Sequence, residues 1–350
     1  LNIWDEYPAP MYNKQYYNSV DTLMGISKQT VNINKLVLGE EAKDKVIEYV
    51  PHGIDEEAFY PITKEHPSWD NFTNFRKDLF GEKEIEYVVF FNSRNIQRKH
   101  PGDTILAYKY FCDKIGPEKA KKCALVMKGE ISSPHGTDLR AVRDAICDTE
   151  YVNVFFNEER LTPEQMNMLY NVADVNVLMS SNEGWGLSLT ESMMSGTMII
   201  PNTTGGMQDQ SRFEDENGKW IDFDSDFPSN HRGKYKKCGE WSLPVFPSNL
   251  ALMGSPLTPY IFDDRCNSED VADRMLEAYE LGQDERNRRG LKGREWAMSD
   301  EASMTAEKMG DRIIEVMDKG FDSFTPRSEF DIIKVENYVK PKVTHNLLDY

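Results

Sequence analysis

The sequence has little positive charge. Its 350 residues include 59 Asp and Glu against 41 Lys and Arg, which gives a formal net charge of −18 and a pI near 4.9. Because phosphate backbones attract surfaces rich in Lys and Arg, nucleic acid is excluded as a general partner. The same deficit argues against docking on anionic lipid through overall charge. A small anionic ligand held by a local group of cations stays compatible with this composition.

Cysteine pairs and long apolar runs are also missing. The five cysteines are odd in number, widely spaced and without a C-x-x-C pair, which argues against a zinc knuckle and a dense disulfide framework. No stretch reaches the roughly 18 apolar residues of a membrane span. We therefore expect a cytoplasmic protein, at most peripheral to a membrane. The chain opens Leu1-Asn2-Ile3 with neither Met nor a signal region, from which we expect the start of a longer polypeptide to be missing.

What the sequence does contain is a regular alternation of apolar runs and helical stretches after residue 84. Thr162, Pro163 and Gln165 predict one helix start, as N-cap, first helical residue and capping-box partner. The alternation predicts an α/β fold with a Rossmann-like, doubly wound parallel sheet, whose ligands bind at the carboxyl ends of the strands. The expected strands are 87–91, 123–127, 152–156, 175–179 and 198–200.

The rest of the chain is divided by changes in this rhythm. Residues 1–62 are interpreted as the C-terminal remnant of another α/β unit, with strands in 21–27 and 46–50, and 63–83 as a linker. The main domain is expected at 84–300. Within it the rhythm lapses over 207–262, a length that indicates an insertion. A last helix is expected from about Ser299, and the tail 320–350 receives no assignment.

The most specific stretch runs from Ser180 to Glu191, with the sequence SSNEGWGLSLTE. It follows a buried strand and opens a helix, where glycines admit a ligand close to the backbone and helix amides suit a phosphate. Glu183 and Glu191 are suited to bind several hydroxyls, as on a sugar and a ribose. On spacing alone, a glycine-rich turn with solvated glutamates is an equal alternative.

These residues resemble a known family. Glu183 and Glu191 form an E-x7-E motif in the setting E-G-[FW]-G-L, so the chain is similar to the retaining nucleotide-sugar glycosyltransferases of family 4, which have the two-domain GT-B fold. The likeness extends over roughly residues 20–315. Its other elements are the PHGID segment at 51–55, the R-x4-K element at 94–99, the loop PNTTGG at 201–206, and Trp296 with a final helix that resembles the segment crossing back onto the N-terminal domain.

The resemblance implies a site for a nucleotide diphosphate sugar that uses no metal and no cofactor. Arg94 and Lys99 would hold the diphosphate, since a guanidinium forks onto phosphate oxygens and an ammonium supplies a point charge. Glu183 would contact the transferred sugar and Glu191 the ribose. The predicted catalytic residues are Glu183, Arg94 and Lys99.

Backbone groups would complete this donor site. Amides at the start of the helix would cradle phosphate as charge builds on the leaving group, and a glycine pair further on would face the donor. The predicted donor-binding residues besides Glu191 are Gly184, Gly186, Leu187, Ser188, Gly205 and Gly206.

The chain departs from the family pattern in several places. His100 stands where the family has a glycine after the R-x4-K lysine, and Asp209 lies in a loop that often carries P-E. The family's N-terminal histidine has no counterpart here, and His52 is interpreted as structural. The Asp222-x-Asp224 pair, a motif of metal-dependent sugar transferases, is interpreted as a turn.

We therefore predict transfer of a sugar from a nucleotide diphosphate to an acceptor hydroxyl, with retention inferred from the family. The partners would be a nucleotide-sugar donor and an unknown glycan, lipid or protein acceptor. Two alternatives stay open: a nucleotide-sugar epimerase or phosphorylase on the same fold, and an inactive nucleotide-sugar-binding module. The second follows from the expected loss of the start of the N-terminal domain, which would carry the acceptor site.

Overall fold

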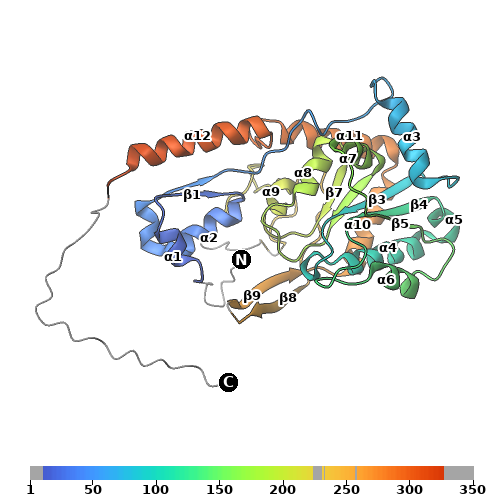
Figure 1. Ribbon diagram of the computed structural model, residues 1–350, viewed down its shortest axis with the longest axis horizontal. Helices are drawn as coiled ribbons and strands as arrows, with labels where there is room; N and C mark the ends of the chain where they lie inside the picture. Colours follow the sequence, from blue (N-terminus) through green and yellow to red (C-terminus); the bar gives the residue numbers. More distant parts are fainter. Residues whose placement is uncertain (1–10, 224–230, 232, 257, 327–350) are drawn as a thin grey trace, which may run out of the picture.

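A computed structural model describes residues 11–223, 231, 233–256 and 258–326. Its centre is a five-stranded parallel sheet with the strand order β5-β4-β3-β6-β7 (Figure 1). The order reverses between β3 and β6, which makes that position the switch point of a doubly wound sheet. The predicted α/β fold class is thereby confirmed. The bounds are β3 Tyr87–Asn92, β4 Cys123–Lys128, β5 Val154–Asn157, β6 Val175–Leu178 and β7 Met198–Pro201.

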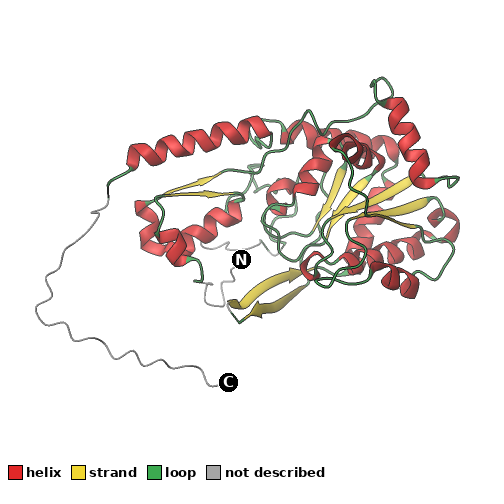
Figure 2. Cartoon of the chain, viewed as in Figure 1, coloured by secondary structure: helices red, strands yellow, loops and turns green. Residues whose placement is uncertain are grey.

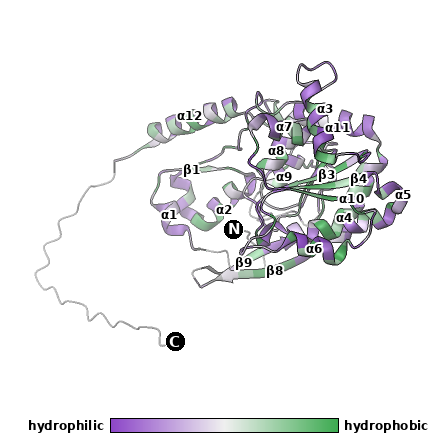
Figure 3. Ribbon diagram, turned by 45° about the vertical axis from the view of Figure 1, so that its right-hand side comes forward, coloured by the Kyte–Doolittle hydropathy of each residue, from purple (hydrophilic) through white to green (hydrophobic). Residues whose placement is uncertain are grey.

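Helices cover both faces of this sheet (Figure 2). Along β3, Val89 and Phe91 face one apolar cluster while Val88 and Phe90 face another, so the strand is buried on both sides. Figure 3 shows the central strands largely in the hydrophobic colour. The helices are α4 Pro101–Ile115, α5 Pro117–Ala120, α6 Leu139–Ile146, α7 Pro163–Val172, α8 Leu187–Met194, α9 Met207–Ser211, α10 Ser268–Glu280 and α11 Gln283–Ala297.

The capping box predicted for α7 is present. The backbone N–H of Gln165 donates to Thr162 Oγ1 at 3.2 Å, and the N–H of Thr162 donates to Gln165 Oε1 at 2.9 Å. This reciprocal bonding satisfies two amides that a helix start would otherwise leave unpaired. Among the helices in the described ranges, none has the length and apolar character needed to cross a membrane.

The segment 63–83 differs from the linker expected there. It contains helix α3, Trp69–Phe80, whose Phe72 and Phe80 are buried in the same cluster as Val88 and Phe90. The aromatic residues of this polar stretch recur at helical spacing, and one face of the helix therefore packs on the main domain. The other domain boundaries stay predictions.

The N-terminal residues form a small unit of their own. It contains α1 Lys14–Asn18, β1 Thr22–Gly25, α2 Lys28–Leu38, a 3₁₀ turn Gly39–Asp44 and β2 Val46–Tyr49, with β1 and β2 parallel. Helix α12, Ala306–Ser323, lies against both strands, so the end of the described chain returns to this unit (Figure 1). The helix begins later than expected from Ser299, because Thr305 is its N-cap and accepts a hydrogen bond from the N–H of Lys308.

The described residues of the predicted insertion 207–262 run along the edge of the sheet and into a hairpin. Leu243 and Val245 donate their backbone N–H groups to Ile199 and Pro201 of β7, each at 2.9 Å, so this stretch runs along the edge strand. An antiparallel hairpin follows, β8 Asn249–Ser255 and β9 Thr258–Arg265, which extends beyond the expected end of the insertion. Asp224, of the Asp222-x-Asp224 pair, lies outside the described residues.

Candidate functional site

A cleft of about 630 Å³ opens at the carboxyl ends of β3, β4 and β6, beside the switch point of the sheet. We call it the donor cleft. Its walls are the loop after β3, residues 128–130 at the end of β4, and the loop that leads into α8, while Ile26 and His52 come from the N-terminal unit. Of the predicted site residues, Arg94, Lys99, Glu183, Gly184, Gly186, Leu187, Ser188 and Glu191 line it.

The loop after β3 brings its lysine onto the first glutamate of the E-x7-E motif. Lys99 Nζ forms an ion pair with Glu183 Oε2, and the two side chains are only 10% and 13% exposed. Burial lowers the pKa of the Lys99 ammonium, and the nearby Glu183 carboxylate opposes that shift. The two predicted ligand groups therefore hold each other at the base of the cleft.

Two arginines flank this pair. Arg98 Nη1 donates to the carbonyl of Asn182 at 2.6 Å and lies 3.4 Å from Glu183 Oε2. The Arg94 guanidinium is exposed and forms no hydrogen bond or ion pair with any residue that the structure describes. With Lys128, the cleft wall carries four Lys and Arg against three Glu, a local positive excess in a protein of net charge −18. Such a local group of cations could hold a small anionic ligand, which the acidic composition of the chain does not exclude.

The second glutamate of the motif is held from below by a buried tyrosine. The Tyr170 hydroxyl donates to Glu191 Oε2, and Asn92 Nδ2 donates to the same hydroxyl oxygen at 2.7 Å. Burial raises the pKa of Glu191, while the Tyr170 hydrogen bond and the nearby His52 oppose the shift. Sequence reasoning did not identify Tyr170 or Asn92, because both lie in apolar runs typical of core.

The loop into α8 is shaped by one glycine and one tryptophan. Gly186, at φ +96°, is the N-cap of α8, a left-handed conformation that glycine adopts at no steric cost. Trp185 is buried and its Nε1 donates to Thr190 Oγ1 at 3.0 Å, which fixes the loop on the helix. The first amides of a helix have no intrahelical partner, so Leu187 and Ser188 bring N–H groups to the cleft.

The glycine pair after β7 lies behind this loop and does not line the cleft. A Cβ atom on Gly205 would lie 1.8 Å from the carbonyl oxygen of Glu183, and the Gly206 N–H donates to that same oxygen at 3.1 Å. Both positions therefore require a residue without a side chain for the backbone of Glu183 to sit where it does. Their predicted contact with a donor stays a prediction, and the structure gives them this packing role.

The two departures from the family pattern have distinct structural results. His100 adopts the left-handed conformation that a glycine would take, with φ +51°, and is the N-cap of α4 ahead of Pro101. Asp209 is buried and accepts a 2.9 Å hydrogen bond from the backbone N–H of Lys28, which opens α2. Burial raises the pKa of Asp209 to about 7. The substituted loop thus ties the main domain to the N-terminal unit.

In the part of the chain that the structure describes, no three His, Cys, Asp or Glu side chains are grouped so as to hold a metal ion. The absence of a metal and of a cofactor stays a prediction.

Part of the chain matches the model of a known protein family. Residues 72–226, which include the R-x4-K element at 94–99 and the E-x7-E segment, match the family model described as Glycosyl transferases group 1. Over these residues the chain is similar to a glycosyl transferase group 1 domain. No curated protein sequence matches the chain.

Solved structures are similar in fold at low sequence identity. Sucrose-phosphate synthase from Thermosynechococcus elongatus has a TM-score of 0.57 at 18% identity, and 89% of this chain matches 61% of it. A glycosyltransferase from Rickettsia africae has a TM-score of 0.58 at 16% identity, covering 90% and 68%. Anabaena HepE in complex with UDP-glucose has a TM-score of 0.58 at 12% identity, covering 85% and 64%. The fold is of the GT-B type, and the chain spans between 61% and 68% of the length of these three proteins.

Proposed function

We propose that this chain takes part in transfer of a sugar from a nucleotide diphosphate to an acceptor hydroxyl. The observation that carries the proposal is the meeting of two motifs in one cleft. The R-x4-K loop and the E-x7-E segment lie far apart in sequence, yet Lys99 and Glu183 are in direct contact at the switch point of the sheet. Ligands of open α/β folds bind at that place.

The chemistry of the walls fits the parts of a nucleotide sugar. Arg94, Lys99 and the first amides of α8 suit a diphosphate, because they combine fixed positive charge with unpaired N–H groups. These groups would stabilise the charge that develops on the leaving diphosphate. The bond from Tyr170 engages Oε2 of Glu191 and leaves Oε1 for a ribose hydroxyl.

Glu183 has two roles in this proposal. In the structure its carboxylate is paired with Lys99 and lies near Arg98. A diphosphate competes with that carboxylate for the same cations, since phosphate oxygens are strong acceptors for ammonium and guanidinium groups. As the cations move to the diphosphate, Glu183 becomes available to hydroxyls of the transferred sugar. Donor binding and presentation of Glu183 to the sugar are thereby linked.

Retention of configuration and membership of family 4 belong to the same proposal. They are supported by the E-x7-E and R-x4-K resemblance, and the acceptor is left as a glycan, lipid or protein. A second candidate, binding of a nucleotide sugar without transfer, is favoured by one observation: the chain spans only 61% to 68% of the proteins it resembles in fold. From the N-terminal unit, only Ile26 and His52 line the cleft in the described structure.

A panel of UDP-, GDP- and ADP-sugars tests both candidates, read by thermal shift and by release of free nucleotide. Transfer predicts stabilisation by at least one nucleotide sugar and release of nucleoside diphosphate that depends on an acceptor. Stabilisation without release under any acceptor tried supports the binding module. Release without net sugar transfer, or consumption of inorganic phosphate, indicates an epimerase or a phosphorylase. If no nucleotide stabilises the protein, the donor-site assignment is wrong.

A further inference from the structure

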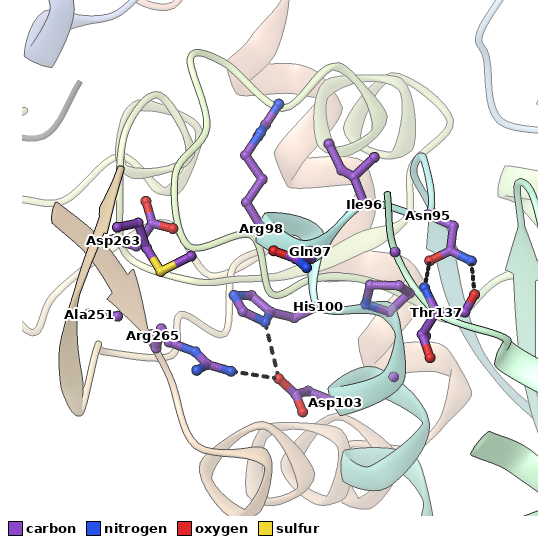
Figure 4. A pocket seen from close by; sticks show the side chains of 14 residues that line it. Asn95, Ile96, Gln97, Arg98, His100, Asp103, Thr137, Ala251, Asp263 and Arg265 are labelled. Carbon is purple, nitrogen blue, oxygen red and sulfur yellow. Dashed lines mark hydrogen bonds and ion pairs between the residues drawn. The ribbon is translucent and has the colours of Figure 1, made fainter. Parts of the chain in front are cut away.

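A second cavity, of about 440 Å³, lies next to the donor cleft (Figure 4). We call it the hairpin cavity, because Ala251, Met253, Asp263 and Arg265 of the β8–β9 hairpin form one side of it. The start of α4 and the 136–137 loop form the rest. Ile96 and Arg98 line both this cavity and the donor cleft, so the segment 96–98 is the wall between them.

The charged groups that face the hairpin cavity are paired with protein groups. They are Arg265, Asp103 and Asp263, because Arg98 turns its guanidinium to Asn182 and Glu183 in the wall of the donor cleft. Arg265 Nη2 lies 3.4 Å from Asp103 Oδ2, and Asp263 Oδ2 accepts a 3.0 Å hydrogen bond from Ser181 Oγ. A phosphate would meet two carboxylates here, and a cation would meet the Arg265 guanidinium. The cavity therefore favours a neutral ligand that accepts and donates hydrogen bonds.

His100 supplies an unused hydrogen-bonding atom. Figure 4 shows its ring among the lining side chains, with Asp103 and Arg265 beside it. Nδ1 lies 3.1 Å from Asp103 Oδ2, which fixes the proton on that nitrogen, while Nε2 is buried without a hydrogen-bond partner in the described structure. Buried polar atoms are nearly always paired, so an unpaired one beside a cavity points to a ligand. A ligand hydroxyl would satisfy Nε2, because an imidazole nitrogen takes part in one hydrogen bond as donor or acceptor.

Apolar groups complete the lining. Ile96, Pro101 and Met253 offer aliphatic surface, and among the described residues no aromatic ring other than the His100 imidazole lines the cavity, so a stacked nucleobase is not favoured. A saccharide presents both faces that this lining requires, hydroxyls for the polar side chains and C–H surface for the aliphatic ones. The volume falls within the range of about 300–1,000 Å³ that small-molecule sites occupy.

We infer that the hairpin cavity binds a neutral saccharide, the remote units of an acceptor glycan whose reacting hydroxyl reaches across Arg98 toward Glu183. Its role as acceptor rests on the proposed function, whereas the saccharide chemistry rests on the cavity itself. Arg98 suits the boundary position, because its guanidinium donates to the Asn182 carbonyl and lies 3.4 Å from Glu183 while its stem lines the hairpin cavity.

The test uses saturation-transfer NMR on the full chain with neutral mono-, di- and trisaccharides of glucose, galactose, mannose and N-acetylglucosamine. Two variants change the cavity: Met253→Trp fills it from a half-exposed strand position, and His100→Gly removes the imidazole where the backbone already suits glycine. Arg274→Ala, a change at a half-exposed position of α10 outside both cavities, is the matched control. Nucleotide binding is measured separately by calorimetry with UDP, GDP and ADP.

We expect at least one saccharide to bind the unchanged protein and the control. Met253→Trp should weaken that binding about tenfold or more, because the larger side chain occupies the space of the ligand, and His100→Gly about threefold to tenfold, as loss of one hydrogen bond does. Saturating nucleotide should not displace the saccharide, and both variants should keep nucleotide affinity within about twofold.

The inference is overturned if no saccharide of the panel binds, if both variants bind it undiminished, or if nucleotide displaces it, which would place it in the donor cleft. Should Met253→Trp unfold in a thermal melt, His100→Gly alone decides the matter. If the unchanged protein binds no nucleotide, the proposed function is contradicted, whereas the result on saccharide binding is unaffected.

Discussion

Two buried ion pairs lie at opposite ends of the central sheet, and they differ in how completely their hydrogen bonds are used. At the amino ends of the strands, Arg286 Nε bonds Asp174 Oδ1 at 2.9 Å, with both side chains only 5% exposed. The guanidinium also donates to the carbonyls of Ala278 and Tyr279, and Asp174 Oδ2 accepts from the N–H of Val88 at 2.7 Å. Every side of this pair is occupied by protein.

At the carboxyl ends, Lys99 and Glu183 form the other pair. The contact uses one carboxylate oxygen, Oε2, and both side chains face the donor cleft. A pair whose hydrogen-bonding groups are all used within the protein, here called saturated, stabilises the fold and has no free donor or acceptor for a ligand. An ion pair with unused hydrogen-bonding capacity at a cleft can exchange partners, which a binding site requires.

The largest effect should follow from breaking the saturated pair. Arg286→Ala leaves the Asp174 carboxylate buried without its counter-ion, and we expect a loss of about 3–5 kcal/mol in the free energy of unfolding, measured by urea denaturation. Nucleotide affinity of the folded fraction should stay within about twofold. A loss below about 1 kcal/mol would show that the pair is not what holds α11 to the sheet.

A third buried carboxylate, Asp209, sharpens the comparison because no side-chain cation in the described ranges forms a hydrogen bond or ion pair with it. Lys28 donates its backbone N–H, and Tyr49 and Asp222 are the other titratable groups near it. Its pKa of about 7 lies above the unfolded value of about 3.9, so the folded state retains a proton that the unfolded chain has released. This contribution to stability therefore falls as pH rises from about 4 to about 7.

Asp209→Asn has no such proton to lose. Relative to the unchanged protein, the free energy of unfolding of the variant should rise by about 2 kcal/mol between pH 5 and pH 8. The amide oxygen can still accept the hydrogen bond from the backbone N–H of Lys28. Urea denaturation at the two pH values measures the difference. Asp263→Asn, at a buried aspartate of the hairpin, is the control. An equal change in both variants would contradict the role given to Asp209.

Breaking the unsaturated pair should change binding more than stability. Lys99→Met keeps the aliphatic stem and removes the charge, and we expect nucleoside diphosphate affinity to fall about tenfold while the free energy of unfolding changes by about 1 kcal/mol or less. Calorimetry and urea denaturation provide the two measurements. Lys109→Met, at a surface ion pair with Asp113, is the matched control. Unfolding without a change in affinity would make this pair another structural one.

Sequence patterns predict the main domain well because its strands are buried on both faces. Runs such as Tyr87–Phe91 then read as continuous apolar segments, and the cap at Thr162 identifies a helix start by local chemistry. Helix α11 was not predicted. Its apolar residues are few, and it packs through glycines: a Cβ on Gly290 would lie 1.9 Å from the carbonyl oxygen of Gly196. Close backbone approach of this kind leaves no apolar stripe in the sequence.

The site was predictable only where motifs are local. Glu183, Glu191, Arg94 and Lys99 stand in short segments with fixed spacing, and all four line the donor cleft. The hydrogen bond of Tyr170 to Glu191 joins helices α7 and α8. His52, from the N-terminal unit, lies near Glu191 of the main domain. Such contacts depend on tertiary packing, so they cannot be predicted from the spacing of residues in the sequence.

The smallest effect is also the one that best separates the two ion pairs. Glu183→Gln removes the negative charge that competes for Lys99, so nucleoside diphosphate should bind about threefold more tightly. A nucleotide sugar should not share this gain, because the variant loses the carboxylate proposed to hold the sugar. The ratio of the two affinities, measured by calorimetry on one protein preparation, is therefore the quantity to follow. Equal weakening of both ligands would mean that Glu183 holds Lys99 in place as Asp174 holds Arg286.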